Sequence, residues 1–266
     1  MTIATLADYE SAVKQPIHFS KNWNGALIAN VWVNHWSPGS DPAGGTLAAG
    51  NTANGVVPTD ATSGAPTINF GSGRGYLTRV EFASLTAHRM RLLILDRLFV
   101  CGAYAFNAST TLASQPSFAA RVPGGTDYHG LQLWFEAVTA FTGTPTCTVT
   151  YTNQNGVAGR TTGAFSMGYV VPGNFSVQMP LAAGDTGVQK IESVTGSVAS
   201  AGTFNILVAR PLWSGRIGIA QLPIVHALER TGMPEIFGDS CLCAYMAPDT
   251  SATTQGFDVR LEVASL

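Results

Sequence analysis

The chain has 266 residues, of which 45% are hydrophobic and only 11% are charged, and its formal net charge is -2. An ordinary soluble domain carries roughly 25% charged residues, so we expect other subunits to cover much of this surface. The 14 Lys and Arg residues form no run that would neutralise a phosphate backbone, which argues against nucleic-acid binding. The longest apolar tract, residues 92–106, is interrupted by Asp96 and Arg97 and is too short to cross a bilayer. We therefore expect neither a nucleic-acid nor a membrane partner.

The first predicted element is a short amphipathic helix over residues 5–15, ended by Pro16. Thr5 is placed to cap this helix, with Asp8 three residues further on. Such a helix either closes one end of a β domain or reaches onto a neighbouring subunit. The apolar residues that share its face, and that we take as interface candidates, are Leu6, Tyr9 and Val13.

The remainder reads as a single β-rich domain over residues 26–266, preceded by the helix and an arm in residues 1–25. Residues 26–33 predict a strand, and residues 37–75 predict a long Gly/Ala/Thr-rich loop whose low charge indicates burial against a partner. Nine further strands are predicted at 76–85, 89–100, 131–138, 146–151, 160–165, 174–179, 188–194, 203–212 and 256–263.

Turn and helix signals fit the same scheme. Asn155-Gly156 predicts a hairpin loop, and residues 222–231, followed by Gly232, predict one short helix in the C-terminal half. Many short strands with Gly-rich turns predict an all-β fold, a β-sandwich or jelly roll.

Three tryptophans near the N-terminus complete the interface candidates. Trp23, Trp32 and Trp36 would stack on sugars or fill a pocket between subunits, and the scarcity of polar partners around them favours the pocket.

No residue pattern predicts a catalytic, cofactor or metal site. Gly238-Asp239-Ser240 resembles the nucleophile block of GDSL esterases, but no histidine follows it to act as the base, so a turn is expected. The cysteines lack zinc-site spacing and are expected to be buried free thiols; they are Cys101, Cys147, Cys241 and Cys243.

Four segments resemble blocks of tailed-bacteriophage virion structural proteins. They are Leu6–Pro16 (LADYESAVKQP), Val149–Thr162 (VTYTNQNGVAGRTT), Leu181–Thr195 (LAAGDTGVQKIESVT) and Ile236–Leu242 (IFGDSCL). The resemblance implies a non-enzymatic protein made in the bacterial host cytoplasm and carried in the particle.

Within that class we expect a capsid decoration (cement) protein on the capsid surface, which binds and bridges major capsid subunits. The implied partners are the major capsid protein and further copies of the chain, and a homo-oligomer such as a trimer would match capsid symmetry. Two alternatives stay open: a tail, collar or baseplate protein, and a carbohydrate-binding module for host recognition.

Overall fold

The computed structural model describes residues 3–36, 39–70, 73–166 and 174–266. The fold is all-β, as predicted: the described residues form many antiparallel strands and two short α-helices. The chain divides into two compact units. Unit 1 comprises Met1–Gly45, Thr59–Asp96 and Leu212–Leu266, and unit 2 comprises Thr46–Pro58 and Arg97–Pro211. The sequence predicted one domain, and no single boundary along the chain separates the two units, because unit 1 is built from three segments and unit 2 from two.

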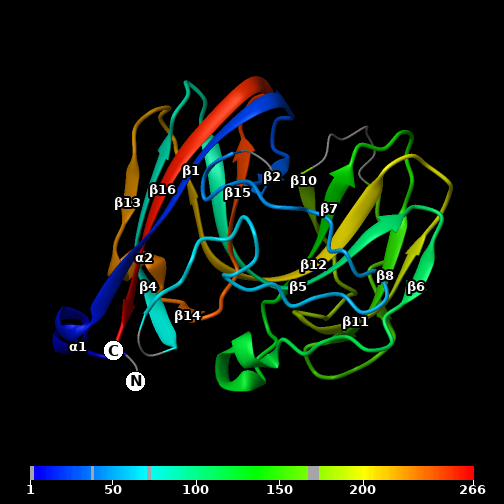
Figure 1. Cartoon of the computed structure of the whole chain (residues 1–266), viewed down its shortest axis with the longest axis horizontal. Helices are drawn as coiled ribbons and strands as arrows, with labels where there is room; N and C mark the ends of the chain where they lie inside the picture. Colours follow the sequence, from blue (N-terminus) through cyan, green and yellow to red (C-terminus); the bar gives the residue numbers. More distant parts are fainter. Residues whose placement is uncertain (1–2, 37–38, 71–72, 167–173) are drawn as a thin grey trace. The chain divides into compact units, whose positions relative to one another are not determined.

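Unit 1 contains a six-stranded sheet with β16 (Ala252–Ser265) between β1 (Val13–Leu27) and β4 (Arg74–Ser84). Figure 1 shows these three long strands side by side. Short strands complete the sheet: β13 (Ile224–His226) and β14 (Glu235–Phe237) pair with β4, and β3 (Ser40–Asp41) pairs with β1. A second layer of unit 1 has β15 (Leu242–Pro248) between β2 (Trp32–Asn34) and the first half of β5 (Met90–Ala105).

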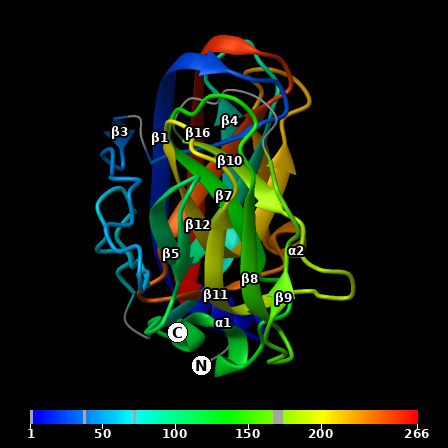
Figure 2. The same cartoon turned by 90° about the vertical axis from the view of Figure 1, so that its right-hand side faces the viewer.

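Unit 2 contains a four-stranded sheet in the order β6 (Ser109–Thr111), β11 (Val188–Gly196), β8 (Cys147–Asn153), β9 (Arg160–Thr161). Figure 2 shows β11, β8 and β9 together. Its other strands are β7 (Gln132–Thr139), β10 (Phe175–Met179), the second half of β5 and the first half of β12 (Thr203–Arg216). Two 3-10 turns span Ala119–Arg121 and Pro123–Gly125. Stacked Phe135 and Phe204, with ring centroids 5.0 Å apart, lie in the core of unit 2.

The N-terminal helix is shorter than predicted. In α1 (Leu6–Ser11) the expected cap is present: the Asp8 amide donates to Thr5 Oγ1 at 3.1 Å, and the Thr5 amide donates to Asp8 Oδ2 at 2.8 Å. The helix ends before Val13 because Val13 begins β1 and pairs with Ser265. Val13 therefore shares no helical face with Leu6 and Tyr9, and residues 13–25 are sheet rather than arm.

Pro16 lies inside β1, although the sequence predicted that it ends a helix. Proline is tolerated there because, among the described residues, β3 pairs with Ser20 and Lys21 alone, which leaves β1 as an edge strand at Pro16. The alternation of buried Ile17 and Phe19 with His18 and Ser20 was the available signal for this strand.

The predicted helix at residues 222–231 is also largely wrong. Only α2 (Leu228–Thr231) is helical, and it ends as expected at Gly232, which has a φ of 69°. Ile224–His226 form β13 instead, because tertiary pairing with β4 outweighs the local helical pattern.

The long segment is irregular, as predicted, but its described residues pack on their own chain. Trp36 is 2% exposed, and the Gly45 amide donates to its carbonyl at 2.8 Å. A Cβ atom at Gly45 would lie 2.6 Å from Trp36 Nε1, and Gly64 lies against the same indole ring. The glycines of the segment therefore permit close packing on a core tryptophan.

Candidate interaction surfaces

The outer face of the large sheet of unit 1 carries charges of alternating sign. Because neighbouring strands align residue by residue, the outward side chains form two rows. One row consists of Pro16, Glu262 and Arg79, and the other consists of His18, Arg260 and Glu81. The sequence signal for this face was the spacing of two between the charges of Arg79 and Glu81, and of Arg260 and Glu262.

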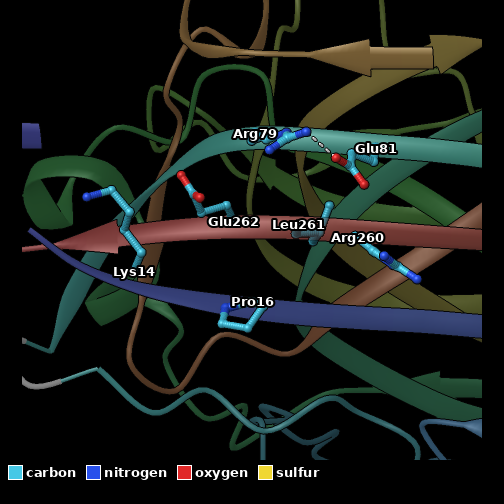
Figure 3. Close-up of a pocket in the computed structure, with 7 residues that line it drawn as sticks. All are labelled: Lys14, Pro16, Arg79, Glu81, Arg260, Leu261 and Glu262. Carbon is cyan, nitrogen blue, oxygen red and sulfur yellow. Dashed lines mark hydrogen bonds and ion pairs between the residues drawn. The ribbon is translucent and has the colours of Figure 1, made fainter. Parts of the chain in front are cut away.

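A groove of about 330 Å³ crosses this face (Figure 3). Its lining residues are Lys14, Pro16, Arg79, Glu81, Arg260, Leu261 and Glu262. The carboxylates in it are already bonded within the chain: Arg79 donates to Glu81, and Glu262 Oε1 accepts from Tyr9 and Thr78, each at 2.8 Å. The hydrogen bond to Glu262 raises the pKa of the Tyr9 hydroxyl. The groove is thus a solvated, internally paired surface.

Of the predicted N-terminal interface residues, Leu6 and Val13 are free to meet a partner. They are 67% and 62% exposed, and α1 contains no buried residue. Tyr9 is half-buried because its hydroxyl holds Glu262 and Lys14 Nζ lies 4.5 Å from its ring centroid. Polar contacts therefore attach α1 to the sheet, while the side chains of Leu6 in the helix and of Val13 after it are exposed.

The three tryptophans do not form a cluster of exposed anchors. Trp23 and Trp32 are half-buried, and the Arg91 guanidinium lies 5.2 Å from the Trp32 ring. Trp36 is a core residue, contrary to its selection as an interface candidate, because His35, Gly45 and Gly64 enclose it.

Unit 2 presents a sheet face covered with hydroxyl groups. One row crosses all four strands, with Ser193 of β11 opposite Thr111 of β6 and Thr150 of β8, and Thr150 opposite Thr161 of β9. In a second row Thr195 lies opposite Ser109 and Thr148, and the Ser109 and Thr195 hydroxyl oxygens are 3.1 Å apart. We call these seven residues the hydroxyl face: Ser109, Thr111, Thr148, Thr150, Thr161, Ser193 and Thr195.

Few charged side chains of unit 2 are exposed. Its charged residues are Arg97, Arg121, Asp127, Glu136, Arg160, Asp185, Lys190, Glu192 and Arg210. Of these, only Asp127 and Lys190 are exposed in the described structure. Glu192 accepts from Thr152 Oγ1 at 2.8 Å and from the Gly159 amide at 3.0 Å. The sequence indicated a low content of charged residues overall, but not that these residues are concentrated in unit 1.

Asp185 is the centre of a polar cluster that fixes the hairpin of β8 and β9. Its carboxylate accepts from Arg160 Nε at 2.8 Å, Tyr151 Oη at 2.7 Å and Asn153 Nδ2 at 2.8 Å. The hydrogen bond from Arg160 is the main reason that the pKa of Asp185 falls to about 2, with Tyr151 and Asn153 contributing. Gly156 takes a φ of 78° in the turn, which confirms the predicted loop at Asn155-Gly156. The cluster therefore stabilises the hydroxyl face.

The residues considered for chemistry have structural partners. Ser240 is fully buried and donates to Asp96 Oδ2 at 2.8 Å, while the Cys241 amide donates to Asp96 Oδ1 at 3.0 Å. The four cysteines are free and buried, as predicted. In the described ranges, no group of three or more His, Cys, Asp or Glu side chains is placed to hold a metal ion. Nor do these ranges include a helix long and apolar enough to cross a membrane.

No protein-family model and no curated protein matches the chain. Among solved structures, it is similar to infectious bursal disease virus of the Gx strain, with 8% identity, a TM-score of 0.20 and coverage of 96% of this chain and 81% of that chain. A mutant VP2 protein of the same virus in T=1 particles gives 10% identity, a TM-score of 0.20 and coverage of 100% and 80%. Folds with scores this low are not equivalent, and we infer no function from them.

Proposed function

We propose that the chain is a structural protein of a tailed-bacteriophage particle, a capsid decoration (cement) protein that binds and bridges major capsid subunits. The observation that carries the proposal is the hydroxyl face: two adjacent rows of Ser and Thr on the paired strands, bordered in the next row by Lys190 opposite Thr152. The segments 149–162 and 181–195, on which the resemblance to phage proteins rests, fall largely on these same strands.

The face suits a permanent contact between proteins. Charged residues are depleted at the centres of interfaces because burying an unpaired charge is costly, whereas a hydroxyl group donates and accepts hydrogen bonds with many partners. Threonine also loses little freedom on binding, because branching at Cβ already restricts χ1.

Bridging requires more than one contact surface. The exposed Leu6, the first residue of α1, and Val13, the first residue of β1, supply a second, apolar contact in unit 1. Contacts of modest strength on several capsid subunits give a high total affinity when they are engaged together.

The proposal is tested by the occupancy of the chain on purified particles. Thr150→Lys with Thr195→Lys places two charges on the hydroxyl face, and should lower occupancy at least about tenfold, since each buried lysine lacks a partner. Thr254→Lys, at an exposed position of β16, is the matched control and should bind as wild type. Circular dichroism should show the same fold in all three proteins.

Full occupancy of the double variant would contradict the proposed role of the face. Copy number, from gel densitometry of particles, separates a capsid position from a tail position: hundreds of copies support decoration, and about a dozen support a tail, collar or baseplate protein. Absence of the chain from particles, combined with binding to a glycan array, would replace the proposal with host recognition.

A further inference from the structure

A histidine bridges the two neighbours of strand β1. His18 lies on the outer face of β1, with Nδ1 3.1 Å from Asp41 Oδ2 on β3 and Nε2 3.0 Å from Asp258 Oδ2 on β16. Both ring nitrogens therefore face carboxylate oxygens.

This geometry sets a requirement on the protons of the ring. An ionised carboxylate only accepts hydrogen bonds, and a neutral imidazole carries one N–H and one lone pair. The two contacts are satisfied together only when both ring nitrogens carry a proton. Once the ring loses a proton, one carboxylate faces a lone pair and is repelled.

The surrounding charges decide which contact is lost. On β16, Arg260 is the cross-strand partner of His18, and its Nε lies 3.6 Å from Asp258 Oδ1. Arg260 in turn lies opposite Glu81 of β4. Asp258 thus keeps a cation beside it when His18 is neutral.

On the β3 side, Asp41 is 65% exposed and belongs to a strand of two residues. The buried Lys21, on the inner face of β1, donates to the Pro42 carbonyl. This hydrogen bond attaches the residue that follows β3 to β1. Residues 65–67, which line a pocket of about 390 Å³ beside His18 and Asp41, bring no charge to the site.

We propose that His18 is a proton-dependent clasp that holds residues 40–43 against the edge of β1. With the ring protonated and the carboxylates ionised, the clasp is closed. When the ring loses a proton, the Asp41 contact opens and β3 loosens, while Asp258 stays in the β16 ladder. The clasp belongs to the isolated chain and does not depend on the proposed place in a particle.

Hydrogen–deuterium exchange of the peptide covering residues 40–43 tests the clasp on the full-length protein. After correction for intrinsic exchange, uptake at about pH 8 should be about twofold to fivefold faster than at about pH 5.5, as expected for an exposed ion pair of a histidine. His18→Gln should remove this dependence. His88→Gln, at the contact of His88 with Thr250, is the control and should keep it.

Asp41→Asn gives the sharper result. The new side-chain amide at position 41 donates to the lone pair of a neutral His18 ring, while the other ring nitrogen still donates to Asp258. The backbone amides of residues 40–43 should therefore stay protected from exchange at the higher pH. Imidazole ¹⁵N shifts report which ring nitrogens of His18 carry a proton, and the slower uptake should accompany the ring with both nitrogens protonated. Equal uptake at the two pH values in the wild type, or the same pH dependence in Asp41→Asn, would overturn the proposal.

Discussion

Arg97 and Glu136 form a two-point ion pair inside unit 2. Arg97 Nη1 lies 2.7 Å from Glu136 Oε1 and Nη2 lies 2.8 Å from Oε2, and the two side chains are 3% and 0% exposed. A chain poor in charge thus places one of its pairs in the interior. Such a pair adds little net stability, because desolvation offsets the attraction, but removal of one partner leaves a buried charge.

Glu136→Ala should therefore lower the free energy of unfolding by about 3 to 5 kcal/mol. The double variant Arg97→Met with Glu136→Leu should lose less than this single variant, because no charge is left unpaired. Urea denaturation measures both values.

The exposed pair of Arg79 and Glu81 is the matched control. Its side chains are 49% and 32% exposed, so removal of Glu81 should cost less than about 1 kcal/mol. If removal of Glu136 and removal of Glu81 lowered the free energy of unfolding equally, the description of Arg97 and Glu136 as a buried ion pair would be contradicted.

Asp185 predicts a loss of stability in acid. Its pKa in the folded chain is about 2, below the ordinary value of 3.8, so the charged form favours folding. Its contribution is complete above the ordinary value and should disappear as pH falls from 3.8 to about 2. Asp185→Asn should be less stable at neutral pH and should show a flatter acid limb in thermal unfolding curves. An unchanged acid limb would show that the cluster does not stabilise the hairpin.

Ser240 should behave as a structural hydroxyl group. Because its side chain is fully buried and donates to Asp96, a fluorophosphonate probe should not label the native protein. Ser240→Ala should lower stability by about 1 to 3 kcal/mol, because Asp96 loses a buried donor. Exposed Ser63→Ala should change stability by less than about 0.5 kcal/mol. Stoichiometric labelling of Ser240 would revive the esterase hypothesis.

The thiols should be inert until the chain unfolds. All four cysteines are buried, and burial raises the pKa of Cys101 and of Cys147 to about 12. Reaction with Ellman's reagent should release no chromophore from the native protein and four equivalents in denaturant. Rapid reaction of any thiol in the native state would contradict the packing described.

Local signals in the sequence were reliable wherever the structure is determined locally. Thr5 and Asp8 cap α1, Gly232 ends α2, and the turn at Asn155-Gly156 joins β8 to β9. Most strands with clear alternation were also found. These features depend on neighbouring residues and backbone propensity.

The features that were missed depend on residues far apart in the chain. Val13–Leu27 form a strand because they pair with β16, which lies at the other end of the sequence. Trp36 was predicted to be an interface residue because its burial depends on Gly45 and Gly64, which lie in the segment predicted as a long loop that packs against a partner. The hydroxyl face arises from the register of four strands, so no single segment could reveal it.

A cryo-EM map of the intact particle is the most direct test of the decoration hypothesis. We expect the chain on the outside of the capsid, with Thr150, Thr161 and Thr195 covered by major capsid subunits and the charged face of β16 exposed to solvent. A map with the chain in the tail, or on the capsid with the hydroxyl face open to solvent, would contradict the account.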